Sequence, residues 1–193
     1  MLMLVIGLLL FIGVHLLPTM PDLRNGVVAR FGEGTYKVAF SIVAAAALAV
    51  IVIGYQKVQL TPGKNPLIWQ PPTWGRHATM ALMLPVFPLL IAAYLPGRIT
   101  QAVRHPMVTA VKLWALAHLL VRGDAASMLL FGSLLAFAIY DRISLKQRES
   151  IGLVAIKSGP MTNDIAAVLG GLVLYGLFVK WGHAALIGIK LIP

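Results

Sequence analysis

Long, uninterrupted apolar runs dominate this chain of 193 residues and limit what it can fold into. Several runs hold roughly 16–21 residues, about the length that a helix needs to cross the hydrocarbon core of a bilayer. Within that core a helix satisfies all of its backbone polar groups internally. The low content of charged residues, 11%, is also unlike that of a soluble domain. We therefore predict an all-α fold: a polytopic transmembrane helical bundle that forms a single integral membrane domain over residues 1–193.

Six spans and one short C-terminal apolar segment are expected, with turn-forming residues between them. The predicted spans are Leu2–Leu17, Tyr36–Tyr55, Arg76–Leu95, Met107–Val121, Ala125–Tyr140 and Ile165–Trp181. The turn Arg122–Asp124 makes the fourth and fifth spans antiparallel neighbours, and Asp124 is placed to cap the fifth. The longest loop, Asp141–Asn163, is expected to include an amphipathic surface helix. The last segment, Ala184–Ile192, is too short to cross a bilayer alone and is predicted to be interfacial or re-entrant.

The charged residues indicate an orientation and a lipid partner. The net charge is +10, and most of the sixteen Lys and Arg residues lie at predicted helix ends and in loops. Ten of them fall on one side of a six-span arrangement and six on the other, so the first side is predicted to be cytoplasmic and the N-terminus to face outward. No Lys/Arg-rich run with interleaved aromatic residues suggests nucleic acid as a partner. The absence of cysteine excludes disulfides and thiolate metal ligands.

The acidic residues argue against several enzyme classes. All six are predicted to lie in loops or at span ends, so no carboxylate pair is expected in the membrane for acid–base chemistry or a proton relay. The sequence contains no HExxH, GxSxG or Gly-rich phosphate-binding motif. A catalytic zinc site would therefore depend on histidine alone.

Histidines are almost the only side chains in the apolar segments that can do chemistry. His118 lies in the sequence LWALAHLL, with Trp114 one turn earlier on the same helix face. A neutral imidazole can offer one nitrogen to a metal and donate a proton from the other to a carbonyl. His15 lies near the end of the first span, two residues after Gly13. The alternatives are a structural histidine bonded to a neighbouring helix at His118 and an interfacial histidine at His15.

The remaining histidines are predicted at helix ends. His105 precedes Pro106 and therefore suits a helix N-terminus. Arg104 beside it can pair with an anion such as a haem propionate or a lipid phosphate, and a plain interfacial turn is the alternative. His105 and His118 would lie about 20 Å apart along one straight helix, so they cannot both bind one metal. His77 and His183 are interpreted as interface anchors.

The ordered pattern GVHLLP, GEGTYKVAFSIVA, RHPMVTAVKLWALAHLL, GD, AS, FGSLLAF and DRIS resembles the NnrU family of bacterial membrane proteins. The resemblance is strongest over residues 13–148. It implies a multi-pass protein of the bacterial inner (cytoplasmic) membrane, with a periplasmic N-terminus under the orientation above. It also implies a link to denitrification and nitrogen-oxide metabolism, with respiratory or denitrification enzymes as partners.

The same residues are similar to zeta-carotene isomerase, a membrane enzyme that contains haem b. That similarity implies His15 and His118 as axial iron ligands, although His15 with His105 fits membrane depth better. Two positions depart from the isomerase: its cysteine is Ala115 here, and its histidine after the second span is Gln56. Our first hypothesis is a haem b protein with a redox or sensing role, with Trp114, Arg104 and His105 beside the haem. The alternatives are a cis–trans isomerase of a carotenoid or other apolar polyene, and a non-enzymatic membrane scaffold or assembly factor.

Overall fold

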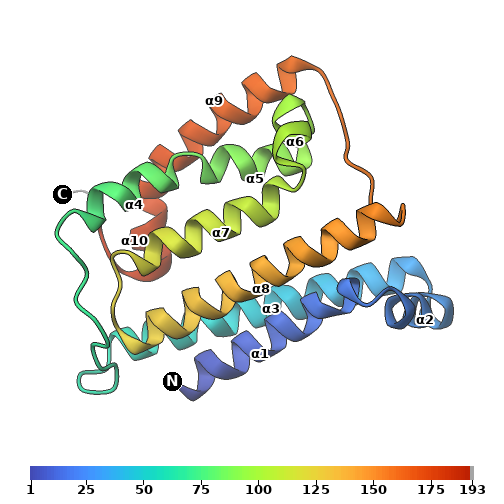
Figure 1. The fold of residues 1–193 in the computed structure, drawn as a ribbon. Helices are drawn as coiled ribbons and strands as arrows, with labels where there is room; N and C mark the ends of the chain where they lie inside the picture. Colours follow the sequence, from blue (N-terminus) through green and yellow to red (C-terminus); the bar gives the residue numbers. More distant parts are fainter. Residues whose placement is uncertain (192–193) are drawn as a thin grey trace. The chain divides into compact units, whose positions relative to one another are not determined.

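The computed structural model describes residues 1–191, which form α-helices joined by turns, with no β-strand among them (Figure 1). Five helices or continuous helical stretches are long and apolar enough to cross a membrane. They are Leu2–Thr19, Glu33–Gln59, Gly75–Ala92, Ala125–Ser150 and Met161–Ile187. A sixth apolar helix, Pro106–Leu119, is shorter and corresponds to the predicted fourth span. The predicted all-α membrane bundle is confirmed.

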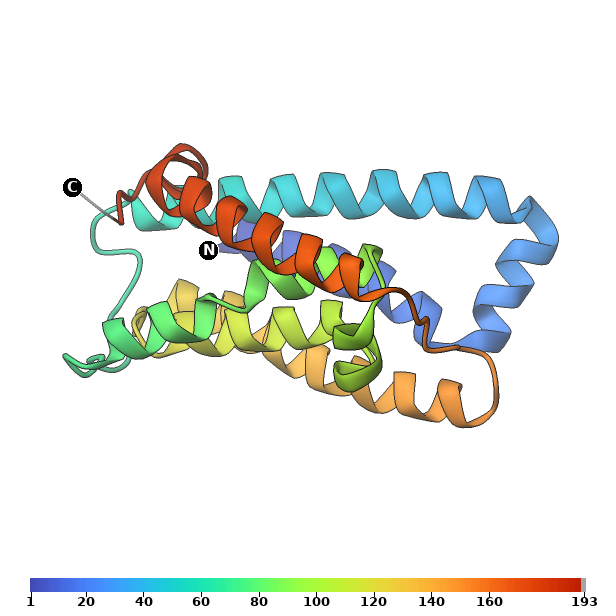
Figure 2. The ribbon, with the colours of Figure 1, turned by 90° about the horizontal axis from the view of Figure 1, so that it is seen from above.

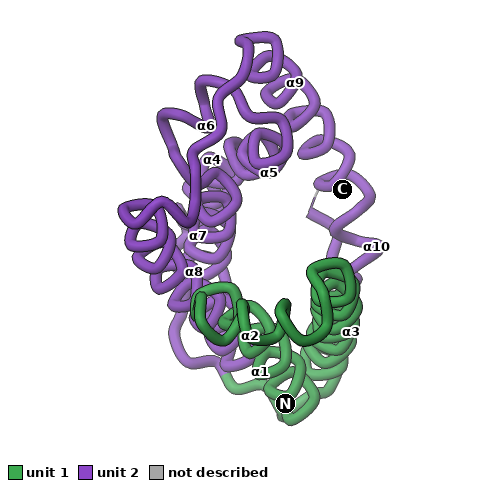
Figure 3. Tube along the Cα trace, turned by 90° about the vertical axis from the view of Figure 1, so that its right-hand side faces the viewer, with its two compact units in different colours: residues 1–66 green, residues 67–193 purple. Residues whose placement is uncertain are grey.

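The chain divides into two compact units, residues 1–66 and residues 67–193, coloured separately in Figure 3. The interpretation of the chain as a single membrane domain stays a prediction. The first unit contains α1 (Leu2–Leu16), η1 (Leu17–Thr19), α2 (Pro21–Phe31) and α3 (Glu33–Gln59). The second contains α4 (Gly75–Met83), α5 (Val86–Tyr94), α6 (Arg98–Val103), α7 (Pro106–Leu119), α8 (Ala125–Ser150), α9 (Met161–Leu177), η2 (Phe178–Gly182) and α10 (His183–Ile187).

Two glycines set the approach of α1 to α3 in the first unit. A Cβ atom added to Gly7 would lie 2.8 Å from the backbone nitrogen of Ile51, and one added to Gly54 would lie 2.7 Å from that of Leu4. Leu4 of α1 meets Gly54 of α3, and Gly7 of α1 meets Ile51 of α3. Because the residue numbers increase along one helix and decrease along the other, the two helices are antiparallel. Small residues that let two backbones approach closely are typical of helix packing in membranes. Lipid tails are as apolar as the side chains, so the hydrophobic effect does not drive helices together there.

The helix α2 connects α1 to α3 at one end of the first unit (Figure 2). Gly32 has φ +83°, a left-handed conformation that favours glycine, and it forms the turn between α2 and α3. Glu33 then begins α3 and forms ion pairs with Lys37 at 2.9 Å and Arg24 at 3.8 Å. The Arg24 guanidinium also lies 5.3 Å from the centre of the Tyr36 ring.

The second unit is organised around α7, which packs against α4, α5, α6 and α8, while α5 packs against α9. The third predicted span, Arg76–Leu95, is interrupted in its middle and forms α4 and α5. Pro85 lies at this break. Proline has no N–H to donate and clashes with the carbonyl four residues earlier, so it divides the span into two shorter helices.

The helix α8 is longer than predicted, because it continues ten residues past Tyr140 to Ser150. The predicted loop Asp141–Asn163 therefore begins too early, although the helix expected within it is present as the last part of α8. No glycine or proline interrupts these residues, and Arg148 stabilises the helix through Asp141 at 3.0 Å and the Ser144 hydroxyl at 3.2 Å. The predicted cap at the other end is confirmed: Asp124 accepts hydrogen bonds from the Ser127 N–H and hydroxyl, at 3.0 and 2.7 Å.

Asp164 joins the start of α9 to the start of α6. Its carboxylate accepts hydrogen bonds from the backbone N–H groups of Arg98 (2.9 Å) and Ile99 (3.0 Å), and it is 9% exposed. The amide of Asn163 also donates to the carbonyl of Pro96 at 2.8 Å. A helix leaves its first N–H groups without internal partners, and the Asp164 carboxylate supplies acceptors for two of them at the start of α6.

The predicted sixth span, Ile165–Trp181, begins earlier and ends later in the structure. The helix starts at Met161, passes through the π-helical turn η2 and continues into α10. Gly188, at φ +79°, ends α10 in a left-handed conformation. The predicted segment Ala184–Ile192 thus begins as the end of this helix, and its residue Ile192 lies outside the described residues.

Candidate functional site

His118 is held on the last turn of α7 by the backbone of its own helix. Its Nδ1 lies 2.8 Å from the carbonyl oxygen of Trp114. Because a carbonyl can only accept, Nδ1 carries the proton and the lone pair of the neutral ring is on Nε2. The imidazole also stacks on the ring of Phe131 from α8, with centroids 4.5 Å apart and planes 22° apart. This geometry fixes both the tautomer and the orientation of the ring.

Trp114 supports this arrangement from the preceding turn. Its ring lies 5.3 Å from the imidazole of His118 and 4.9 Å from Phe131, edge to face with the latter. On its other side it packs against the core of Val86, Leu89 and Ala110. Trp114 therefore connects the His118 ring to the interface of α5 with α7.

His15 shows the same backbone anchoring in the first unit. Its Nδ1 lies 2.7 Å from the carbonyl oxygen of Phe11, four residues earlier, which again places the proton on Nδ1. The ring stacks on Phe11 at 4.1 Å and meets the edge of Phe40 at 5.1 Å. His15 and His118 thus share a hydrogen-bonding pattern common among metal-binding histidines, in which the second ring nitrogen is oriented by a carbonyl.

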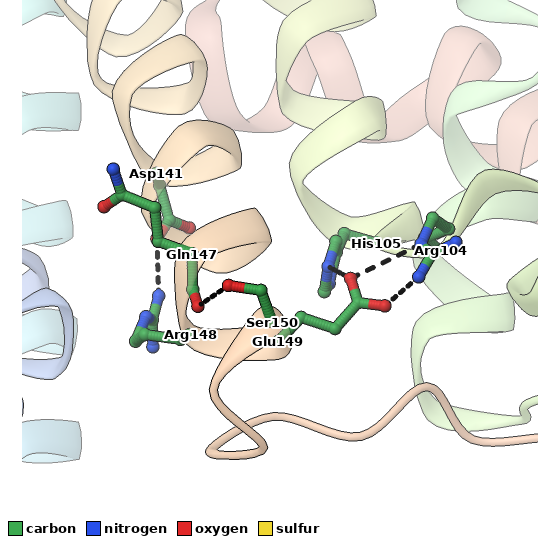
Figure 4. Close-up of polar contacts among 7 residues, drawn as sticks. All are labelled: Arg104, His105, Asp141, Gln147, Arg148, Glu149 and Ser150. Atoms are coloured by element: carbon green, nitrogen blue, oxygen red, sulfur yellow. Dashed lines mark hydrogen bonds and ion pairs between the residues drawn. The ribbon is translucent and has the colours of Figure 1, made fainter.

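The predicted turn before α7 forms a charged cluster with the end of α8 (Figure 4). Arg104 has φ +68°, which is rare for a side chain larger than glycine, and its guanidinium binds both carboxylate oxygens of Glu149. His105 precedes the helix as predicted, and its Nε2 lies 3.5 Å from Glu149. In the structure the anion beside Arg104 is therefore Glu149, and the predicted contact with a propionate stays a prediction.

The environment of His105 favours its neutral form. Its side chain is 9% exposed. Burial, followed by the positive charge of Arg142, lowers the pKa of His105 below its ordinary value, against the opposing hydrogen bond and charge of Glu149 and the charge of Asp141. His105 and His118 stand at opposite ends of α7, so the structure does not bring them together. The choice between His15–His118 and His15–His105 as ligands stays a prediction.

The acidic residues were predicted in loops or at span ends, and Glu149 and Asp164 lie at helix ends as predicted, whereas Asp141 lies well inside α8. Among residues 1–191, no group of three or more His, Cys, Asp or Glu side chains could hold a metal ion. A haem iron needs no such group, because the porphyrin supplies four nitrogens and the protein supplies axial ligands.

His183 was interpreted from the sequence as an interface anchor, and in the structure its ring is held by the backbone of the chain that follows it. It begins α10, and its Nδ1 lies 2.8 Å from the carbonyl oxygen of Ile189. His183 is half-buried, whereas His77, on the first turn of α4, is exposed. Gly182 and Gly188, on either side of His183 in the sequence, could have indicated this contact, because glycines allow an irregular backbone around a histidine.

The arrangement of apolar helices defines a multi-pass α-helical membrane protein. The chain belongs to the NnrU family, since the family model described as NnrU protein matches residues 3–191. That match covers both compact units and extends beyond the segment in which the sequence resemblance was strongest. No curated protein and no solved structure matches the chain.

Proposed function

We propose that this NnrU-family protein binds haem b in the bacterial inner membrane and has a redox or sensing role in nitrogen-oxide metabolism. The observation that carries the proposal is the state of His118. The Trp114 carbonyl holds the proton on Nδ1, and Phe131 and Trp114 fix the ring, so that the Nε2 lone pair suits an iron atom. Haem, when bound, would supply a one-electron couple, which is what a redox or sensing role requires.

The residues around His118 fit an apolar cofactor. Phe131 is 4% exposed, and Ala115 and Ala117 on the same helix are fully buried. The aromatic rings limit the access of water to the imidazole, and the Trp114 carbonyl selects the tautomer whose Nε2 lone pair can bind a metal. In His15 the carbonyl of Phe11 likewise holds the proton on Nδ1, which supports its predicted role as the second axial ligand.

The test is a visible spectrum of the full-length protein purified in mild detergent. We expect a Soret band, reduced b-type α and β bands after dithionite, and a pyridine haemochrome of haem b. His118→Ala should lose most of the bound haem, whereas His77→Ala, a matched control at an exposed histidine, should keep it. A protein that stays colourless when haem is supplied during expression, although it is folded, would overturn the proposal and favour the scaffold alternative.

The isomerase alternative is tested with the same preparation. Position 115 carries a buried methyl group in place of the thiol of the isomerase, so no sulfur ligand is present three residues before His118. We expect haem-loaded, reduced protein to leave di-cis and tri-cis zeta-carotene unchanged. Isomer turnover that requires reduced iron and His118 would instead establish the enzymatic reading.

A further inference from the structure

The last part of α8, residues 141–150, contains three basic and two acidic residues, and one buried donor there lacks a partner. The carboxylate of Glu149 is bound by the guanidinium of Arg104, and that of Asp141 by Arg148 (Figure 4). Both acidic side chains are therefore engaged. The Nη1 of Arg142 is buried and has no hydrogen-bond partner among residues 1–191. Buried donors in proteins are nearly always hydrogen-bonded to protein, water or a bound ion, so Arg142 points to an acceptor from outside the chain.

His105 lies near Arg142 and offers a second polar group. The charge of Arg142 acts on the imidazole, which brings the two side chains together where α7 begins beside α8. The imidazole is 9% exposed, and its Nε2 lies 3.5 Å from Glu149, a distance longer than a normal hydrogen bond. His105 also precedes α7, which begins without a side-chain cap. Because the first N–H groups of a helix lack internal partners and carry partial positive charge, this end of α7 adds to the attraction for an anion.

The face of α8 that carries Arg142 changes from apolar to basic side chains. Arg142 shares this face with Ile139, three residues before it, and with Lys146, four residues after it. Ile139 and its neighbour Ile143 are 49% and 57% exposed, and Lys146 is exposed as well. Tyr140, at the end of the apolar part of α8, is of the residue type that is enriched at the membrane–water interface. This face therefore places an apolar surface beside a basic one at the level expected for lipid headgroups.

We propose that Arg142, with Lys146 and His105, binds the phosphate group of an anionic phospholipid where α8 leaves the apolar part of the membrane. A guanidinium can donate two parallel hydrogen bonds to phosphate oxygens, and a neutral imidazole can donate one more. Arg142 is half-buried as a whole, so a headgroup can reach it from the exposed face of α8. The exposed isoleucines suit the acyl chains of a lipid, which a free phosphate ion does not have. This site is independent of haem binding.

The test measures lipid binding to the full-length protein in mild detergent, by native mass spectrometry and by the thermal shift that the lipid causes. Phosphatidylglycerol is the probe, and phosphatidylcholine, which has a phosphate but no net charge, should bind the wild type more weakly. We expect Arg142→Gln to weaken phosphatidylglycerol binding about tenfold, because a charge-assisted hydrogen bond is lost. Arg98→Gln is the matched control, since it removes the same charge from an exposed arginine of the same unit, and it should bind like the wild type.

Unfolding without added lipid separates a binding role from a structural one. Loss of a buried charge that lacks a partner removes a desolvation cost, so Arg142→Gln should unfold no earlier than the wild type. Phosphatidylglycerol should then stabilise the wild type and not this variant. A variant that unfolds earlier without lipid, yet gains the full shift with it, would show a structural arginine and overturn the proposal.

Two further outcomes would contradict the lipid site. Equal weakening of phosphatidylglycerol binding in Arg142→Gln and Arg98→Gln would show that only net charge matters. Inorganic phosphate at millimolar concentration is the last comparison, and it should neither stabilise the protein nor displace the lipid. Stabilisation by inorganic phosphate that requires Arg142, without binding of phosphatidylglycerol, would overturn the lipid and assign the site to a free phosphate.

Discussion

Residues 1–66 bring α1 and α3 together by omitting side chains, whereas residues 67–193 also hold helices together with polar side chains that bind backbone groups. In the first unit, Gly7 and Gly54 allow the backbones of α1 and α3 to meet. In the second, Asp164 fixes the start of α6, and the buried Thr100 hydroxyl donates to the carbonyl of Ala92 at 2.9 Å. The packing of α1 on α3 depends on shape. The second unit adds hydrogen bonds of this kind to a close backbone approach of its own at Gly171, where an added Cβ atom would clash with Pro88 of α5, so different substitutions should disrupt the two units.

The largest effect is expected from Gly54→Leu in the first unit. Even the first side-chain carbon would lie 2.7 Å from the backbone of α1, and backbone cannot move aside as a flexible side chain can. Overpacking of this kind costs about 3 kcal/mol or more. We expect loss of most folded protein in detergent, measured by thermal unfolding and size-exclusion chromatography. Gly13→Leu, where the added carbon has open space, is the control, and equal losses in both variants would contradict this account.

A second comparison concerns the aromatic rings beside the two histidines. Phe131 is 4% exposed and contacts both His118 and Trp114, so Phe131→Ala should destabilise the protein by about 2–3 kcal/mol. Phe40 is only half-buried and meets His15 by its edge, so Phe40→Ala should cost about 1 kcal/mol. Unfolding in mixed detergent would measure both free energies, and a reversed order would show that the His15 environment is the better packed.

The cap at Asp164 should matter less than packing but more than surface charge. Asp164→Ala removes the acceptor of two backbone N–H groups at the start of α6 and should cost about 1–2 kcal/mol. Asp22→Ala changes an exposed acidic residue in the first turn of α2 and should be nearly neutral. Hydrogen exchange at Arg98 and Ile99 should increase in Asp164→Ala. Unchanged exchange there would mean that other contacts hold α6.

The smallest effect is expected from pH at His105. Burial and the charge of Arg142 lower the pKa of His105, although Glu149 and Asp141 oppose this change. The unfolded chain therefore takes up a proton at higher pH than the folded protein. The stabilising effect is complete above the unfolded pKa and is lost as pH falls through the folded pKa. Wild-type protein should lose more thermal stability than His105→Gln between pH 7.5 and 5, and parallel profiles would exclude His105 as the cause.

The sequence predicted the helices because apolar length is a direct consequence of the bilayer. It placed Asp124 as a helix cap for a similar local reason. It ended α8 at Tyr140, because the charged residues that follow resemble a loop, although Arg148 bonds Asp141 and Ser144 within the helix. Apolar patterns mark where a helix enters lipid, and they do not mark where the same helix ends in water.

The candidate site was predictable residue by residue but not as a set of contacts. His118 and Trp114 were found because a histidine in an apolar helix is uncommon and their spacing is local. The pairing of Arg104 with Glu149 joins residues 45 positions apart, and no local spacing indicates it. His183 was interpreted as an interface anchor because nothing near it in sequence shows that Arg76 donates to the carbonyl of Leu191 and so holds the segment that follows His183 against α4. Contacts of that range require the fold.

The shortness of α7 has a consequence for how the protein responds to its lipid. At 14 residues the helix is about 21 Å long, against a hydrocarbon core of about 30 Å. The helices α4, α5, α6 and α8 pack against it, so α7 contacts protein more than lipid acyl chains, and its length need not match the thickness of the bilayer. Hydrophobic mismatch should therefore act on the more exposed α9 and leave α7 unchanged. We therefore expect the position of the His118 imidazole, at the end of α7, to stay the same when the thickness of the membrane changes.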